Sequence, residues 1–416
     1  MRISLKNIWS ELYILLLVLF PILNNYSIFI PIGDILAIIL LPILCMKRKK
    51  FSVTRIENTK YYLIFLIFSF FSLLVNIIYT PSLNYADIFA KNFHIVLYAI
   101  YALYLSKYFF NLDSFTSKLK KVIDFVVIVE IIEQIIYTLS GKQLYLLLPF
   151  LRLNYTDTLY SDYVRNMTFA SISQGYRPSS LFLEPAHFAS VVIIGLVFRI
   201  TEKSKSYKDY IFLLMYVVSI LISRSSGGIV SLGICCMFYL FFCKVESRKE
   251  RKFKYLLGAV VLCASLYLLI GNSSIMNIVL SRIGEIGSMV YDTSGNRRVL
   301  RGYLVFGELS NLHHIIGTGF GNLLNTITLN GIRVLTDASY TEEMAQIPYM
   351  LCSTGLTGTL LYYFTFLKKF SKRKNINKLL TLIFVLSGFF NNYILQASCI
   401  LYMVCIFNRT TNEVVR

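Results

Sequence analysis

Charged residues make up only 15% of the 416 residues, whereas a soluble domain carries about 25%. Apolar residues make up 56%, and they fall in blocks of roughly 17–22 residues, the length with which a helix crosses about 30 Å of hydrocarbon. The scarcity of charge therefore argues against an ordinary soluble domain. Segments of about ten residues with alternating polarity, as a membrane β-barrel requires, are also missing, so helices are the expected form.

Features that mark other protein classes are missing as well. None of the eight cysteines has a spacing partner in a polar loop, so neither a disulfide framework nor a zinc site is supported. No Asp-x-Asp pair lies on a plausible nucleotide-sugar site, and we expect no metal and no cofactor. The internal repeats of many transporters are absent. No small-residue cleavage site follows the first apolar run, which we interpret as a retained helix.

The apolar blocks predict an all-α, polytopic integral membrane bundle of about twelve transmembrane helices, with residues 1–416 forming a single membrane domain. The second, seventh and eleventh spans are short, and the last two could form a hairpin that does not fully cross. The expected spans are roughly 11–30, 32–46, 60–79, 86–106, 122–139, 181–200, 209–223, 226–243, 255–270, 347–367, 379–391 and 393–408.

Lysine-rich connections set the expected orientation. They follow alternate helices, near residues 47–50, 107–121, 199–208, 244–254 and 368–378. Cytoplasmic loops are enriched in lysine and arginine, and these five connections share one side only if both termini are cytoplasmic. The net charge of +19 is explained mostly by this bias, so we expect no nucleic-acid partner.

The opposite side is predicted to hold two long external loops, 140–180 and 271–346, and an excess of arginine. Loops of this length are usually functional or disordered, and the second contains an amphipathic stretch at 275–291. Arginine offers a planar fork of donors that fits phosphate or carboxylate oxygens, so an anionic ligand is one explanation, and pairing with external acids is the other. Against a single external lysine, Lys142, the external arginines are Arg152, Arg165, Arg177, Arg224, Arg282, Arg297, Arg298, Arg301 and Arg333.

Three stretches carry the candidate chemistry. Residues 177–189 place Arg177 outside a membrane helix and the Glu184-Pro185 pair about one turn inside it, where an ionisable residue should face a cavity or a partner. Residues 294–322 combine an arginine cluster, on a predicted helix from 299 to 309, with a glycine-rich segment at 317–321. That segment has no P-loop lysine, so a tight external turn is the better interpretation. Residues 346–359 carry small residues suited to close helix packing.

These stretches, their order and the two external loops together resemble the O-antigen polymerase (Wzy) family, which is grouped with the O-antigen ligases as multi-pass glycosyltransferases of bacterial envelopes. The resemblance in topology covers nearly the whole chain, whereas the matching motifs are short. They are Arg177…Phe182-x-Glu184-Pro185…Ala189, Ser223-Arg224, Ser294-Gly295…Arg297, Gly317-x-Gly319-x-Gly321 and Gly355-x-x-Gly358.

The resemblance implies metal-independent block transfer at the external face of the bacterial inner membrane. A glycan held on undecaprenyl diphosphate would move onto a new lipid-linked repeat unit, with membrane lipid and a chain-length regulator protein as further partners. The pyrophosphate would be bound by arginines, chosen in the order Arg177, Arg297 and Arg298, then Arg224 and Arg301. The general base would be Glu184, with Glu342, Glu343, Asp337 and His187 as rivals.

Two alternative functions stay open at this stage. A polysaccharide flippase also needs about twelve helices, although it usually has repeat symmetry and short loops. A ligase resembles the polymerase but carries a histidine where this chain reads Glu342-Glu343-Met344-Ala345-Gln346. Other polar residues have structural interpretations: His313 and His314 as a cap or surface pair, His94 and Asn92 as bundle hydrogen bonds, and Glu130 with Glu133 as a pair sharing a proton or a polar partner.

Overall fold

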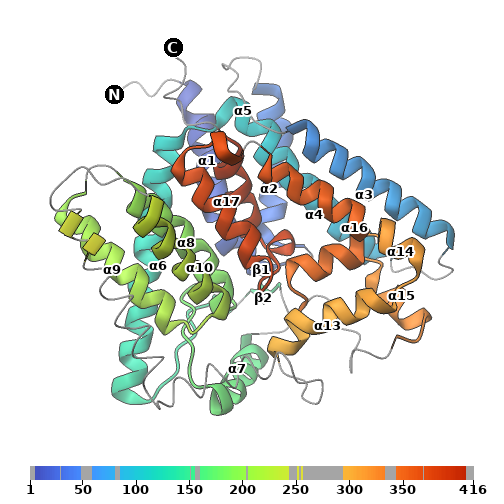
Figure 1. The fold of residues 1–416 in the computed structure, drawn as a ribbon. Helices are drawn as coiled ribbons and strands as arrows, with labels where there is room; N and C mark the ends of the chain where they lie inside the picture. Colours follow the sequence, from blue (N-terminus) through green and yellow to red (C-terminus); the bar gives the residue numbers. More distant parts are fainter. Residues whose placement is uncertain are drawn as a thin grey trace.

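The computed structural model describes residues 5–28, 30–47, 59–79, 85–149, 151–154, 160–202, 205–242, 251–252, 254–255, 294–332, 343–368 and 370–408. Across these residues the fold is all-α, with one two-stranded antiparallel ladder that pairs Tyr26 with Leu153 (Figure 1). The elements are α1 (Leu5–Leu23), β1 (Tyr26–Ser27), α2 (Ile32–Lys47), α3 (Thr59–Tyr79), α4 (Tyr85–Ala99), α5 (Ser106–Phe109), α6 (Leu112–Ser140), β2 (Arg152–Leu153), α7 (Tyr160–Gln174), α8 (Pro185–Thr201), α9 (Tyr207–Ile222), α10 (Ser226–Phe242), α13 (Ser294–Glu308), α14 (Asn311–Ile316), α15 (Leu323–Leu329), α16 (Gln346–Leu367), α17 (Asn375–Ser387) and α18 (Ser398–Phe407).

Three of the described helical segments are long and apolar enough to cross a membrane. They are Thr59–Tyr79, Tyr85–Phe109 and Gln346–Leu367; the second joins α4 to α5 through a π-helical turn at Ile100–Leu105. On α3 the exposed apolar residues recur at helical spacing, at Leu63, Ile64, Ile67, Phe70, Phe71, Leu74 and Ile78. An exposed apolar stripe of this kind is stable against lipid but not against water, so these helices indicate a membrane protein.

The expected twelve spans are not confirmed as such. The expected span at 255–270 lies outside the described residues, and so does the amphipathic stretch at 275–291. Five further apolar helices have 10–17 residues, among them α17 and α18, which at 1.5 Å per residue are only about 20 and 15 Å long. The expectation that the last two helices could fall short of a full crossing agrees with these lengths.

Several expected boundaries were wrong for identifiable reasons. The first span was expected to reach residue 30, but α1 ends at Leu23 because Asn24 and Asn25 form a turn into β1. The fifth was expected to begin at 122, but α6 begins at Leu112, where the Asn111 side chain accepts hydrogen bonds from the backbone of Asp113 and Ser114. Polar first turns of this kind extend a helix beyond its apolar part.

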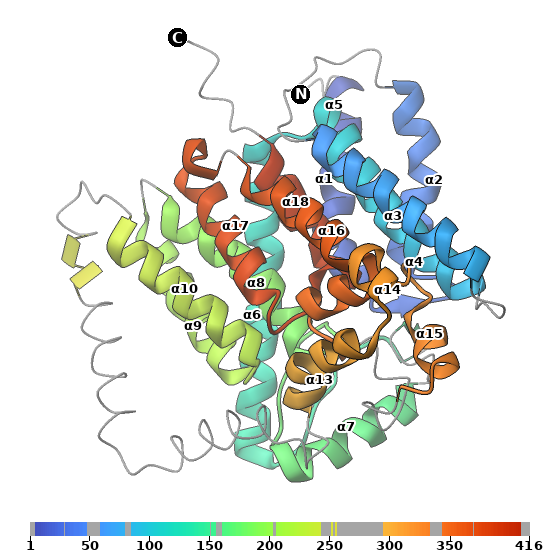
Figure 2. The same ribbon diagram turned by 45° about the vertical axis from the view of Figure 1, so that its right-hand side comes forward.

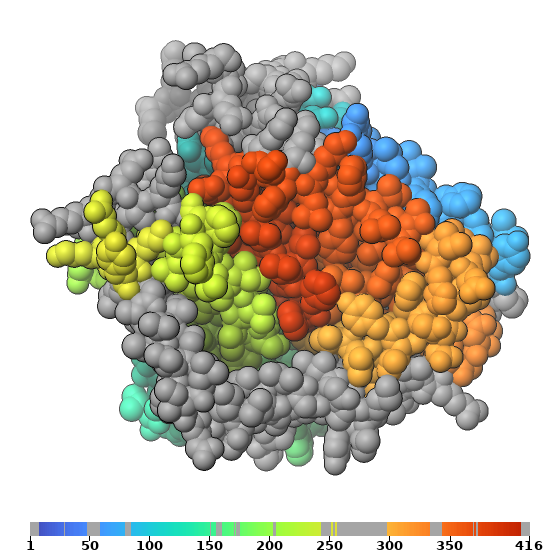
Figure 3. Space-filling model, in the orientation of Figure 1, coloured from blue at the N-terminus to red at the C-terminus, as the bar shows by residue number. Residues whose placement is uncertain are grey.

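The described parts of the two segments that were predicted to be external are folded. In 140–180, β2 and α7 enclose an aromatic cluster in which Tyr145 contacts the rings of both Tyr163 and Tyr176. Burial there raises the pKa of Tyr145 to about 12. In 271–346, α13 and α14 pack against α16, as Figure 2 shows, and Figure 3 shows this part of the chain at the surface beside α16.

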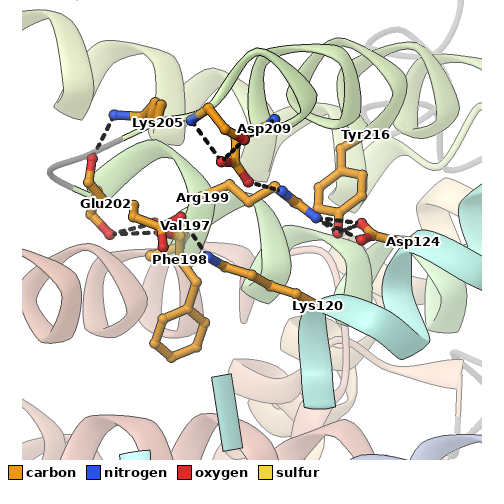
Figure 4. A network of polar contacts seen from close by, with 11 residues as sticks. Lys120, Asp124, Val197, Phe198, Arg199, Glu202, Lys205, Asp209 and Tyr216 are labelled. Carbon is orange, nitrogen blue, oxygen red and sulfur yellow. Dashed lines mark hydrogen bonds and ion pairs between the residues drawn. The ribbon is translucent and has the colours of Figure 1, made fainter. Parts of the chain in front are cut away.

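Ion pairs join the helix ends on one side of the bundle. Lys118 pairs with Glu11, which ties the start of α6 to α1, and Lys120 pairs with Glu202 after α8. Nearby, the buried Arg199 guanidinium binds both Asp124 oxygens, at 2.6 and 2.7 Å, and Asp209 at 2.5 Å, while Tyr216 donates to Asp124 (Figure 4). Lys118 and Lys120 both belong to the expected cytoplasmic connection 107–121, and Lys120 pairs there with Glu202 of the expected connection 199–208.

Removing the guanidinium from this network is expected to destabilise the fold. Arg199→Met would leave two carboxylates without their cation, and breaking a buried pair costs about 3–5 kcal/mol. Because Asp124 and Asp209 are each 21% exposed, we expect the free energy of unfolding to fall by about 2 kcal/mol. This loss would be visible as a lower thermal unfolding midpoint in detergent. If the double variant Arg199→Met/Asp124→Asn lost less stability than Arg199→Met alone, the unpaired charge would explain the loss. Equal losses of stability in the two variants would contradict that explanation.

Candidate functional site

A cavity of about 950 Å³ lies where the ends of several helices meet. Its lining comes from the end of α1, the starts of α2, α4 and α8, the connection between α17 and α18, and Arg298 of α13. This volume is at the upper end of the roughly 300–1,000 Å³ typical of ligand sites. The lining holds Glu184, His187 and Arg298, three of the residues that the sequence singled out.

Glu184 lies at the N-terminus of α8 and not inside a helix, which corrects the sequence expectation. Its backbone is extended (φ −133°, ψ 145°), and Pro185 is the first helical residue. Proline is well tolerated there because that position needs no backbone donor, so it starts the helix and does not bend it. Glu184 consequently lies at the start of α8, where it lines the cavity.

The segment before Glu184 is held by buried polar side chains. Ser180 has a positive φ of 54°, and its backbone N–H donates to the Glu133 carboxylate at 2.9 Å. Asn25 fixes the same segment by donating to the Leu181 carbonyl at 2.8 Å. Glu130 instead accepts from the Ser219 hydroxyl at 2.8 Å. Glu130 and Glu133 thus have separate polar partners, as one of the two interpretations predicted, and Glu133 positions the segment that carries Glu184.

Arg298 is the arginine that meets Glu184. Its guanidinium lies 3.8 Å from the Glu184 carboxylate, and the two side chains are 29% and 25% exposed. Helix α13 is fixed for this contact: the Ala345 N–H donates to the Arg298 carbonyl, and Gly302 packs so closely on Pro348 that a Cβ would lie 2.6 Å away. The pair therefore joins two rigid elements that are more than 100 residues apart in the sequence.

Among the candidate arginines whose side chains the structure describes, Arg177, Arg224 and Arg301 do not line the cavity. Arg177 donates to the Ser223 carbonyl at 3.3 Å, and Arg224 lies against Gly175, so these two are neighbours at the turn between α9 and α10. Arg301 is 6% exposed in α13. Arg297 belongs to α13, but its side chain is outside the described residues, as are Arg333 and the whole of Asp337 and Glu342.

Among the rival bases that the structure describes, His187 and Glu343 line the cavity with Glu184. His187 lies in the first turn of α8, where its N–H donates to the Glu184 carbonyl at 3.1 Å. Within the described part of the chain, no three His, Cys, Asp or Glu side chains come together in a way that could hold a metal ion. The cavity chemistry available from these residues is acid–base transfer and anion binding.

The glycine-rich segment at 317–321 packs backbone against backbone. Helix α16 breaks at Gly355 (φ 64°), and the Cys352 and Ser353 carbonyls accept from the Thr318 and Gly319 N–H groups at 2.9 and 2.8 Å. This segment is the turn that the sequence analysis favoured. Its glycines allow the close approach, which also explains the small residues of 346–359.

His313 is held as a structural hydrogen-bond bridge. Its ring nitrogens contact Ser310 and Asn76 at 3.0 and 2.9 Å, and burial lowers its pKa. The ring is therefore neutral near pH 7 and unsuited to pairing with phosphate. His314 contacts the Phe306 carbonyl at 2.6 Å, which agrees with the structural interpretation of this histidine pair.

Sequence reasoning missed several cavity residues. Asp34 lies in α2 with its carboxylate 3.0 Å from the His94 ring, and Asp87 pairs with Lys91 at 3.0 Å in α4. An ionisable residue within an apolar block was the available signal for Asp34.

Comparison with known proteins assigns no family to this chain: no protein-family model matches the sequence, and no curated protein matches it.

Proposed function

We propose that this protein polymerises undecaprenyl-diphosphate-linked oligosaccharide repeat units into an O-antigen or capsule-type polysaccharide. The observation that carries the proposal is the meeting of Glu184 and Arg298, 3.8 Å apart, at a cavity large enough for sugar units. Three helices long and apolar enough to cross a membrane support access to a lipid-linked substrate. The resemblance to O-antigen polymerases supplies the substrate class.

In the proposed reaction an acceptor hydroxyl attacks the anomeric carbon of the growing glycan. The bond from that carbon to the diphosphate oxygen breaks, the new glycosidic bond forms with inversion, and undecaprenyl diphosphate leaves. Arg298 would neutralise charge that develops on the leaving group. Glu184 is the first choice to accept the hydroxyl proton, with His187 and Glu343 beside it.

The proposal includes a location. The protein would lie in the bacterial inner membrane with both termini cytoplasmic, and the cavity would open toward the external face. Lys118 and Lys120 form their ion pairs at one end of the bundle. Lysine favours the cytoplasmic side of a membrane, so the presence of both lysines at this end supports the proposed orientation. A chain-length regulator protein would be a further partner.

Purified protein incubated with a single synthetic lipid-linked repeat unit tests the proposal. We expect a ladder of products that differ by one repeat unit, with release of undecaprenyl diphosphate. Unchanged substrate lengths, with the lipid-linked unit crossing liposome membranes, would instead indicate a flippase. Transfer only to an added lipid A acceptor would indicate a ligase.

A further inference from the structure

A buried carboxylate–histidine pair lies in the cavity on elements other than those that carry Glu184 and Arg298. Asp34, at the start of α2, accepts from the Asn24 amide at 3.1 Å with one oxygen and contacts His94 Nδ1 at 3.0 Å with the other. A carboxylate cannot donate, so the neutral form of the ring carries its proton on Nδ1 and accepts at Nε2. The pair therefore fixes the tautomer of His94.

Three polar groups here have buried atoms without hydrogen bonds. Among the described residues, His94 Nε2, Asn24 Oδ1 and both ends of the Asn392 amide have no hydrogen-bond partner, and all three residues line the cavity. Asn392 is 9% exposed. Buried polar atoms are nearly always paired, and leaving them unpaired costs free energy. A side chain kept in this state needs a reason other than stability.

The chemistry of these atoms selects the ligand. Asn24 Oδ1 packs against Gly33, 2.1 Å from the position of an added Cβ, so it does not face a ligand. Nε2 of the neutral His94 ring only accepts, whereas the Asn392 amide both donates and accepts. A phosphate oxygen only accepts, so it would oppose His94, whereas a hydroxyl donates and accepts at once and can satisfy both residues. The two parts of the cavity therefore differ: a cation is available at Arg298, and hydroxyl partners are available at His94 and Asn392.

We propose that His94 and Asn392 form a subsite that binds hydroxyl groups of a neutral sugar, with Asp34 orienting His94. This inference rests on the proposed function for its sugar, which would be the terminal unit of the acceptor repeat. In that arrangement, the acceptor sugar occupies the side of the cavity formed by α1, α2 and α4, and the donor diphosphate occupies the side formed by α8 and α13.

Asn392→Ala is the sharpest variant because it removes an amide that makes no hydrogen bond to the described residues. The probe is the free oligosaccharide released by mild acid from the lipid-linked repeat units of the source bacterium, which carries no lipid or diphosphate. Saturation-transfer NMR on the full chain in phosphatidylcholine nanodiscs would measure its binding. We expect about tenfold weaker binding in Asn392→Ala, with an unchanged or higher thermal midpoint.

Asn330→Ala, on the exposed end of α15, is the matched control and should bind as the unmodified protein does. His94→Phe keeps a ring against Tyr98 and should also weaken binding. The inference is overturned if the oligosaccharide does not bind, if Asn392→Ala binds it normally, or if Asn392→Ala merely loses stability. It is also overturned if phosphatidylglycerol displaces the oligosaccharide, because a lipid head group would then supply the hydroxyls.

The binding measurement separates this inference from the proposed function. If the free oligosaccharide bound in a way that depends on Asn392 but no polymer ladder formed, the proposed subsite would be supported and the polymerase function would be contradicted. A ladder whose acceptor KM is unchanged in Asn392→Ala would sustain the polymerase and contradict the subsite.

Discussion

Arg298→Lys is expected to lower the rate of polymer formation about 100-fold, the loss typical of removing one donor that stabilises transition-state charge. Lysine keeps the positive charge but not the planar fork that binds two phosphate oxygens together. Its ammonium could still pair with Glu184, so the fold should persist. Product ladders from purified protein and the synthetic lipid-linked unit would measure the rate, and the thermal midpoint would report the fold.

Arg165→Lys is the matched control for that variant. Arg165 lies in α7, is 67% exposed and pairs with Asp162 at 3.1 Å. An exposed pair of this kind contributes little, so polymer formation should not change. If Arg298→Lys formed polymer at the rate of Arg165→Lys, Arg298 would be removed from the proposed site.

The sequence predicted the helical fold well because apolar blocks record the demands of a lipid environment directly. Spanning lengths were harder to predict. A polar first turn such as that after Asn111 adds helix to an apolar block, and the Asn24-Asn25 turn shortens one.

The site was only partly predictable. Sequence adjacency suggested Glu184 and His187, and the arginine cluster suggested Arg298, but the contact between α8 and α13 depends on tertiary packing. The role of Asp34 was missed because its partner His94 is 60 residues away. A polar residue in an apolar block reveals that a partner is needed, but it does not identify that partner.

A substitution at Gly317 tests how the 317–321 segment packs against the backbone of α16. Gly317 has φ 79°, and an added Cβ would lie 2.4 Å from the backbone of Ser353 and Thr354. Neither backbone can move without disturbing the break in α16 at Gly355. We therefore expect Gly317→Ala to cost about 4 kcal/mol or more, from the left-handed conformation and the overlap together.

Gly331→Ala separates those two causes. Gly331 also has a positive φ, 60°, but no described atom lies within 4 Å of the added Cβ, so only the conformational cost of about 1 kcal/mol applies. Thermal midpoints in detergent should place Gly331→Ala near the unmodified protein and Gly317→Ala far below it. Equal losses would mean that backbone conformation, and not the contact with α16, explains the glycine. A large loss of stability in Gly317→Ala alone would make the 317–321 segment a packing element whose glycines serve the contact with α16 and not a nucleotide.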